Sequence, residues 1–283
     1  MRSILFALCV AAVLAVAPSA IAEDTPLWKL VAQSNVIVET VLDVPETFPE
    51  RAYVTLRLRD VRTLKADGGA QPSIRWYSEP QLYQPSIDQL RSASGSLSVV
   101  FAVRSEGQLY FAGNTPAALR QADPSVIAAV QAEVARQDGL LASWQTDRNT
   151  PHYAEVRAII EEIVALPPPS RDERRSGIPA QQRLFDRLIA LGPEAVPTII
   201  TLMDDDRPLG YPAISLVNTS PDAFEGLRHY TPKVLTDALA AVLNQITGEH
   251  FGFIYNGASP DDRRRTVNAW RIYLDHLKSG AAA

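Results

Sequence analysis

The chain has 283 residues, of which 46% are hydrophobic and 21% are charged, and its formal net charge is −5. These proportions are typical of a folded globular protein and exclude a wholly disordered chain. Because a mildly acidic protein has no basic field, neither nucleic acid nor an anionic membrane is expected as a partner.

Residues 1–22 have the pattern of a secretory signal peptide, with a positive charge at Arg2, an apolar run over 4–17 and small residues before a cleavage site after Ala22. The apolar run is shorter than the roughly twenty residues that cross a bilayer. We therefore expect a periplasmic or secreted protein with no integral membrane segment after cleavage. Because Cys9, the single cysteine, lies in the removed segment, the mature chain would have no disulfide and no thiolate.

Residues 23–116 are predicted to form a small β domain. From Val36 to Ala112 the apolar residues recur with period two, and in the segment 53–59 they share one face. About five short strands in such a stretch favour closure into a small antiparallel barrel or a curled sheet. The layout resembles the OB-like barrels of many exported proteins, and a simpler antiparallel sheet is the alternative.

After Asn114 the apolar period changes to that of helices, which predicts an α+β protein of two domains. We expect a helical hairpin over 117–166, a Pro-rich charged linker over 167–177 and an all-α domain over 178–283. Helix starts are predicted where a capping residue precedes a proline, at Thr25-Pro26, Asp123-Pro124, Thr150-Pro151, Thr231-Pro232 and Ser259-Pro260.

The domain over 178–283 is predicted to contain two helix pairs, over 181–203 and 231–277. The segment 188–197, with its Gly-Pro turn, resembles the turn and second helix of a HEAT-type repeat, in which antiparallel helices stack into a curved array. The resemblance implies a scaffold for binding and names no ligand. The insertion over 207–230 makes the spacing of the pairs longer than in regular repeats.

Standard catalytic signatures are missing from the sequence. It contains no G-x-S-x-G, no H-E-x-x-H, no Gly-rich phosphate loop and no S-x-x-K. Its 4 histidines are too widely spaced to mark a zinc site by themselves. We therefore predict no catalytic residue, no metal and no cofactor.

The preferred site is a pocket formed by the insertion 207–230 and the loop 248–257, because the loops of a repeat array project along one edge. A protein or peptide is the expected partner. In a competing interpretation, Phe251, Phe253 and Tyr255 only close the end of the array. The predicted binding residues are His229, Tyr230, Glu249, His250, Tyr255 and Asn256.

Three other groups of residues could form sites, but a structural role is preferred for each. Asp204-Asp205-Asp206 carries oxygen ligands suited to calcium, but lacks the EF-hand spacing. Arg263-Arg264-Arg265 could hold a phosphate or carboxylate group, although Asp261 and Asp262 balance its charge. Trp76, with Tyr77 and Tyr83, could present aromatics to a peptide or glycan, but a strand Trp is expected in the core.

The sequence favours an exported, non-enzymatic interaction or assembly module. One alternative is an envelope hydrolase with acid/base residues drawn from Glu249, His250, His229 and the cluster 204–206. It would require His229 or His250 within hydrogen-bond reach of a carboxylate at the floor of a pocket. A second alternative is a soluble inhibitor that uses the β domain, which would require an exposed aromatic or apolar patch there.

Overall fold

The computed structural model describes residues 25–50, 52–66, 72–78, 84–105, 107–168, 170, 172, 180–219 and 225–280. The predicted signal peptide, Tyr83 and most of the predicted linker lie outside these ranges. The N-terminal part contains, in order, α1 (Leu27–Gln33), β1 (Val36–Asp43), β2 (Tyr53–Ala66), β3 (Ser73–Tyr77), α2 (Ile87–Ala93), β4 (Leu97–Ser105), β5 (Gln108–Phe111), the 3₁₀ helix η1 (Pro116–Ala118) and β6 (Leu119–Gln121). The C-terminal part contains α3 (Pro124–Ala142), α4 (Tyr153–Ala165), α6 (Ala180–Ala190), the 3₁₀ helix η2 (Gly192–Ala195), α7 (Val196–Thr201), β7 (Ile214–Val217), β8 (Leu227–Tyr230), α8 (Leu235–Thr247) and α9 (Pro260–Lys278).

The β half closes into a barrel. Its strands follow the order β1-β2-β3-β5-β4, and β1 also pairs with β4, so the five strands form a ring to which β6 adds at β4. The alternation seen in the sequence fills the interior, where Val54, Leu56 and Leu58 are buried. The expected antiparallel barrel is thus present with one correction: β3 and β5 run parallel where Arg75 pairs with Tyr110.

Trp76 lies in the barrel core, as expected for a strand Trp. Its side chain is 4% exposed, and its indole N–H donates to the carbonyl of Pro85 at 2.8 Å. α2 packs against the same core through the fully buried Leu90. The polar edge of the indole is therefore satisfied inside the barrel, and Trp76 is not available to a ligand.

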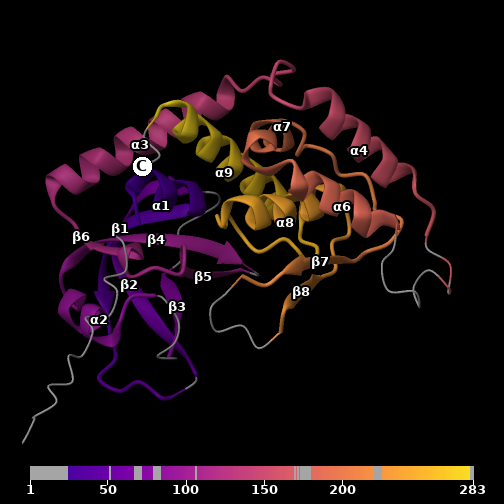
Figure 1. Ribbon diagram of the computed structural model, residues 1–283. Coiled ribbons are helices and arrows are strands. Elements are labelled where there is room, and N and C mark those ends of the chain that lie inside the picture. The colour runs from indigo at the N-terminus through magenta and orange to yellow at the C-terminus, as the bar shows by residue number, and fades with distance from the viewer. Residues whose placement is uncertain are drawn as a thin grey trace, which may run out of the picture.

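α1 and α3 cover the outer surface of the barrel at β1 and β4. Leu30 and Val31 of α1 and Val130 of α3 form a second core with Ile37 and Phe101. α3 then runs across α1 toward α9 (Figure 1). The two halves of the chain are therefore in contact through α1, α3 and α9.

The two helices expected to form one hairpin over 117–166 pack against different neighbours. α3 contacts α1, β2 and α9, whereas α4 contacts α6 and α7. α3 buries Val130 and Gln137, whereas α4 buries Val156, Ile159 and Ile163 in the helical core. α3 and α4 therefore each pack mainly against other helices.

α8 is the centre of the helical part. Every residue from Leu235 to Leu243 is buried, and the helix contacts α6, α7, α9 and β7. A helix buried on all sides is a core helix of its domain. The expectation of an all-α domain is wrong, because β7 and β8 form a two-stranded antiparallel sheet inside the 207–230 insertion.

Two of the predicted Pro helix starts are confirmed. α3 begins at Pro124 after Asp123, whose carboxylate accepts the N–H groups of Ser125 and Val126, and α9 begins at Pro260 after Ser259. α8 instead starts at Leu235, after Thr231-Pro232. The carboxylate of Asp237, in the first turn of α8, accepts the N–H groups of Lys233 and Val234 just before the helix. Asp237 therefore caps the N-terminus of α8.

Candidate functional site

The two loops of the predicted site lie together. The ring of Tyr230, at the end of β8, is 5.0 Å from the ring of Tyr255 and 6.1 Å from that of Phe253, centroid to centroid. Phe253 and Tyr255 are 5.2 Å apart in the same way. We call Tyr230, Phe253 and Tyr255 the aromatic cluster. Edge-to-face and tilted arrangements of this kind hold each ring in place.

The aromatic side chains of the 248–257 loop differ in their exposure to solvent. Tyr255 is 3% exposed and Phe251, which packs on Trp270, is 2% exposed, whereas 62% of Phe253 is exposed. Phe251 and Tyr255 thus close the core as the competing interpretation expected. Phe253 does not, and it presents an apolar ring on the surface.

His250 is bonded to Tyr255. Its Nδ1 lies 3.0 Å from the Tyr255 hydroxyl. Burial lowers the pKa of His250 below its ordinary value, and the positive charge of Lys29 lowers it further. Burial also raises the pKa of the Tyr255 hydroxyl. The pair is therefore a hydrogen-bonded unit that is uncharged at physiological pH.

Glu249 forms an ion pair with Lys29 of α1. Its carboxylate lies 2.5 Å from the ammonium nitrogen of Lys29. Next to it, the side-chain amide of Gln33 donates to the carbonyl of His250 at 2.8 Å. These contacts tie the 248–257 loop to α1. The Glu249–His250 acid/base pair considered from the sequence is not formed.

His229 and Tyr230 diverge because successive residues of a strand point to opposite faces. His229 is exposed, and its Nδ1 lies 3.0 Å from the hydroxyl of Ser215 on the paired strand. It therefore lies outside the aromatic cluster, contrary to the predicted common pocket. Asn256 is exposed and accepts the N–H of Thr231 at 2.9 Å, so it joins the two loops.

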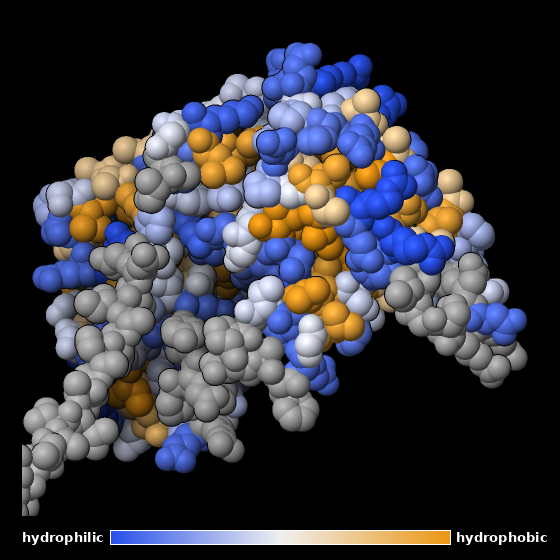
Figure 2. Space-filling view, viewed as in Figure 1, coloured by the Kyte–Doolittle hydropathy of each residue, from blue (hydrophilic) through white to orange (hydrophobic). Residues whose placement is uncertain are grey.

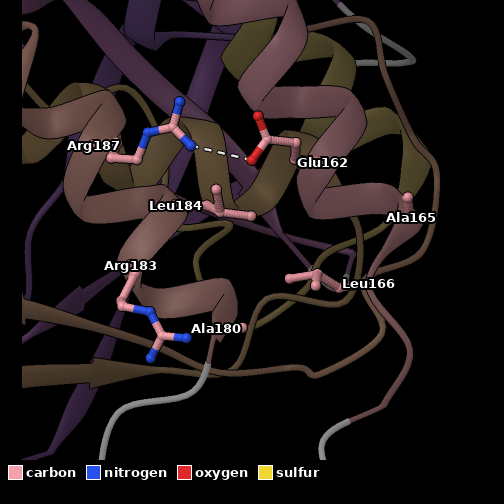
Figure 3. Close-up of a pocket in the computed structure, with 7 residues that line it drawn as sticks. All are labelled: Glu162, Ala165, Leu166, Ala180, Arg183, Leu184 and Arg187. Atoms are coloured by element: carbon pink, nitrogen blue, oxygen red, sulfur yellow. Dashed lines mark hydrogen bonds and ion pairs between the residues drawn. The ribbon is translucent and has the colours of Figure 1, made fainter.

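A groove between α4 and α6 was not found from the sequence. It has a volume of about 500 Å³, and Figure 3 shows Arg187 and Glu162 facing each other across it. Their ion pair spans 3.1 Å. The i, i+4 spacing of Arg183 and Arg187 on one face of α6 was the available signal. The lining residues are Glu162, Ala165, Leu166, Ala180, Arg183, Leu184 and Arg187.

The acidic cluster 204–206 and the arginine run 263–265 both form ion pairs. Asp204 binds Arg271 and Asp205 binds Arg207, whose guanidinium also binds Glu161. The three arginines of the 263–265 run each have a carboxylate partner, in Asp237, Asp261 and Asp262 respectively. Across the described ranges, no group of three His, Cys, Asp or Glu side chains is placed to hold a metal ion.

The barrel carries an exposed aromatic patch, which we call the barrel face. Tyr53 on β2 is 56% exposed, and its ring centroid lies 4.8 Å from that of Tyr77 and 6.0 Å from that of Tyr110. The Arg75 guanidinium carbon lies 5.6 Å from the Tyr53 centroid. Of the aromatic residues that the sequence offered here, the alternation of β3 puts Trp76 inside, as expected, and Tyr77 outside together with Arg75.

In the part of the chain that the structure describes, none of the helices has both the length and the apolar character needed to cross a membrane. Comparisons with protein-family models, with curated proteins and with solved structures give no match to this chain.

Proposed function

We propose that the chain is an exported interaction or assembly module that binds a protein or peptide through the surface around Phe253. The observation that carries this proposal is the 62% exposure of Phe253, an apolar ring that packs against Tyr230 and Tyr255. A ring held by its neighbours loses little conformational entropy on binding, and aromatic residues often dominate binding energy. Export to the periplasm or beyond is supported by the pattern of residues 1–22.

The scaffold proposed for this module combines an OB-like barrel with HEAT-like helices. The closed ring of five strands supports the first likeness. Contacts of α6 with α8 and of α7 with α9 support the second, because corresponding helices of successive pairs stack in this way in repeat proteins. The β7–β8 sheet is an addition to such a pattern.

The test is quantitative cross-linking of the tagged full chain in an envelope fraction, followed by the same measurement with Phe253→Ala. We expect the partner signal to fall at least about tenfold, as for an aromatic hot spot. Leu97→Ala is the matched control, because Leu97 is an exposed apolar residue, at 42%, on the barrel. An unchanged partner signal with Phe253→Ala would reject the proposal.

The hydrolase alternative gains no support from these positions. It needed His229 or His250 beside a carboxylate in a pocket, but His250 is bonded to Tyr255 and His229 to Ser215. The nearest acid in sequence, Glu249, is bound to Lys29.

The barrel face supports a second candidate, in which the β domain occupies a site on another protein. The exposed Tyr53 with the half-buried Tyr77, Tyr110 and Arg75 beside it supports this candidate, because such an inhibitor requires an aromatic or apolar patch at the surface. Tyr53→Ala in the same cross-linking experiment distinguishes the two candidates. A loss with Tyr53→Ala and not with Phe253→Ala would assign binding to the barrel face.

A further inference from the structure

Along each strand of the β7–β8 hairpin, the main-chain N–H and C=O groups point alternately toward the partner strand and toward the outer edge. The N–H of Asn218 donates to the carbonyl of Gly226 at 2.9 Å, just beyond the paired residues Val217 and Leu227. In an antiparallel pair, hydrogen-bonded and non-hydrogen-bonded positions alternate. The N–H and C=O groups of Leu227 and His229 therefore point outward from β8, and those of Ser215 point outward from β7.

The outer edge of β7 is closed by side chains of α6. The Gln182 side chain accepts the N–H of Ser215 at 2.8 Å and donates to the carbonyl of Ser215 at 2.8 Å. Gln181 donates to the carbonyls of Tyr211 and Ala213 just before the strand. The amides thus take the place that a third strand would have.

The outer edge of β8 has no such cover within the described ranges. The sheet contains only β7 and β8, and no described group bonds the main-chain N–H or C=O of Leu227 or His229. In Figure 1, β8 is the outer strand of the hairpin. The open edge ends at Thr231, whose N–H is bound by Asn256. Unpaired edges of this kind are a template for another strand.

An apolar pair flanks the open edge. Val217 and Leu227 lie directly opposite each other and are 58% and 46% exposed. Figure 2 shows apolar surface over the β7–β8 hairpin. On the other face of β8, Arg228 is held by Asn244 and Gln245, and Tyr230 by the aromatic cluster. The edge is therefore rigid as well as open.

We propose that the edge of β8 binds an extended peptide segment of another protein by strand addition. The segment would exchange main-chain hydrogen bonds with Leu227 and His229 and place an apolar side chain against Val217 and Leu227. This inference rests on the proposed function and names its partner class. In the register that pairs Leu227 with His229 of a second copy, two Arg228 residues would lie directly opposite each other, which disfavours that pairing.

The experiment selects random peptides of about ten residues, displayed on phage, against the full chain. Selected peptides are then synthesised and titrated with the wild type and with His229→Pro. This change removes an outward N–H and leaves the hairpin's own hydrogen bonds in place, and proline is tolerated on an edge strand. We expect about a tenfold loss of affinity, and a similar loss when alternate peptide residues are N-methylated.

Amide hydrogen exchange gives an independent readout. Bound peptide should slow exchange at Leu227 and His229 and leave Ser215, already bonded to Gln182, unchanged. Leu227→Lys, which places a charge on an exposed position of the edge, should block binding even where His229→Pro does not fold.

Three outcomes would overturn strand addition: no enriched peptide, affinities unchanged by both His229→Pro and Leu227→Lys, or exchange protection that depends on protein concentration without peptide. The last result would assign the edge to a second copy. Phe253→Ala separates this inference from the proposed function. Peptides that lose affinity with Phe253→Ala but not with the edge variants would leave the proposed function standing alone.

Discussion

The guanidinium of Arg263, in the first turn of α9, reaches back to the buried carboxylate of Asp237 in the first turn of α8. Nε lies 2.7 Å from Oδ1 and Nη2 lies 2.9 Å from Oδ2, and the Asp237 side chain has no exposed surface. The same carboxylate accepts two N–H groups of the 233–234 segment. This pair therefore fixes the chain between Tyr230 and α8, on which the aromatic cluster depends.

Removing the arginine should destabilise the protein strongly. Arg263→Ala leaves the carboxylate of Asp237 buried without its cation, so we expect a loss of about 3 kcal/mol or more in the free energy of unfolding, measured with urea. Arg264→Ala is the control, because Arg264 is 60% exposed and pairs with an exposed Asp261. Its cost should stay below about 1 kcal/mol. Equal costs for the two variants would contradict a structural role for the buried pair.

Acid should weaken the site loop through His250. Burial holds the pKa of His250 below its ordinary value of 6.5, with Lys29 contributing and Glu249 opposing, and Tyr255 is its hydrogen-bond partner. The unfolded chain then binds the proton more readily, so His250 reduces stability as pH falls through about 6.5. The free energy of unfolding of the wild type relative to His250→Gln should decrease between pH 7.5 and 5, by at most about 1.4 kcal/mol per pH unit.

The wild type supplies the comparison for this pH series. If His250→Gln and the wild type show parallel pH profiles, burial of His250 does not control the acid response.

Trp28 should couple α1 to the helical part. Its ring stacks on His276 at 4.3 Å between centroids and lies 6.2 Å from Phe251. We expect Trp28→Ala to cost about 2 kcal/mol or more, and Trp28→Phe to cost less because a ring remains. Urea unfolding followed by both circular dichroism and tryptophan fluorescence checks this. Coincident transitions with an unchanged midpoint in Trp28→Ala would contradict the coupling.

Gly252 should be more sensitive to substitution than Gly248, although both have positive φ. At Gly252 φ is +92° and a Cβ would lie 2.7 Å from the Thr266 hydroxyl, whereas at Gly248 φ is +73° and the space is open. Both Ala variants should lose about 1 kcal/mol from backbone strain. Only Gly252→Ala adds a steric cost, so thermal unfolding should rank it as the less stable variant.

A double variant checks the cause of that ranking. Thr266→Ala removes the hydroxyl that the new Cβ would meet. Combined with Gly252→Ala, it should recover part of the loss, which a double-mutant cycle measures. Additive losses would show that Thr266 is not what Gly252 makes room for.

The candidate site was predicted from the sequence only in part. The proximity of the 207–230 insertion to the 248–257 loop followed from repeat-like architecture, and Tyr230 does contact Tyr255. Assigning His229 to the same pocket was wrong, because β8 was not foreseen and its alternation separates neighbouring side chains. The competing interpretation placed Phe253 with Phe251 and Tyr255 at the closed end of the array, but Phe251 and Tyr255 are buried and Phe253 is exposed.

The sequence by itself determined the features that depend on near neighbours. Period two in the 53–59 segment predicted a strand with Leu56 inside, and Asp123-Pro124 and Ser259-Pro260 predicted helix starts at the correct residues. Such signals are local, because a strand face repeats every two residues and a cap acts within one turn. The change of period after Asn114 likewise predicted a β half followed by helices.

The tertiary structure decided what depends on residues far apart in the chain. Closure of the barrel needs β1 to pair with β4, and the sealing of β7 needs Gln182 to meet Ser215. No local pattern reports that Gln182 fills one edge of the hairpin while nothing among the described residues fills the other. Main-chain hydrogen-bonding groups have no sequence signature of their own, so whether they are satisfied becomes visible only when the whole chain is folded.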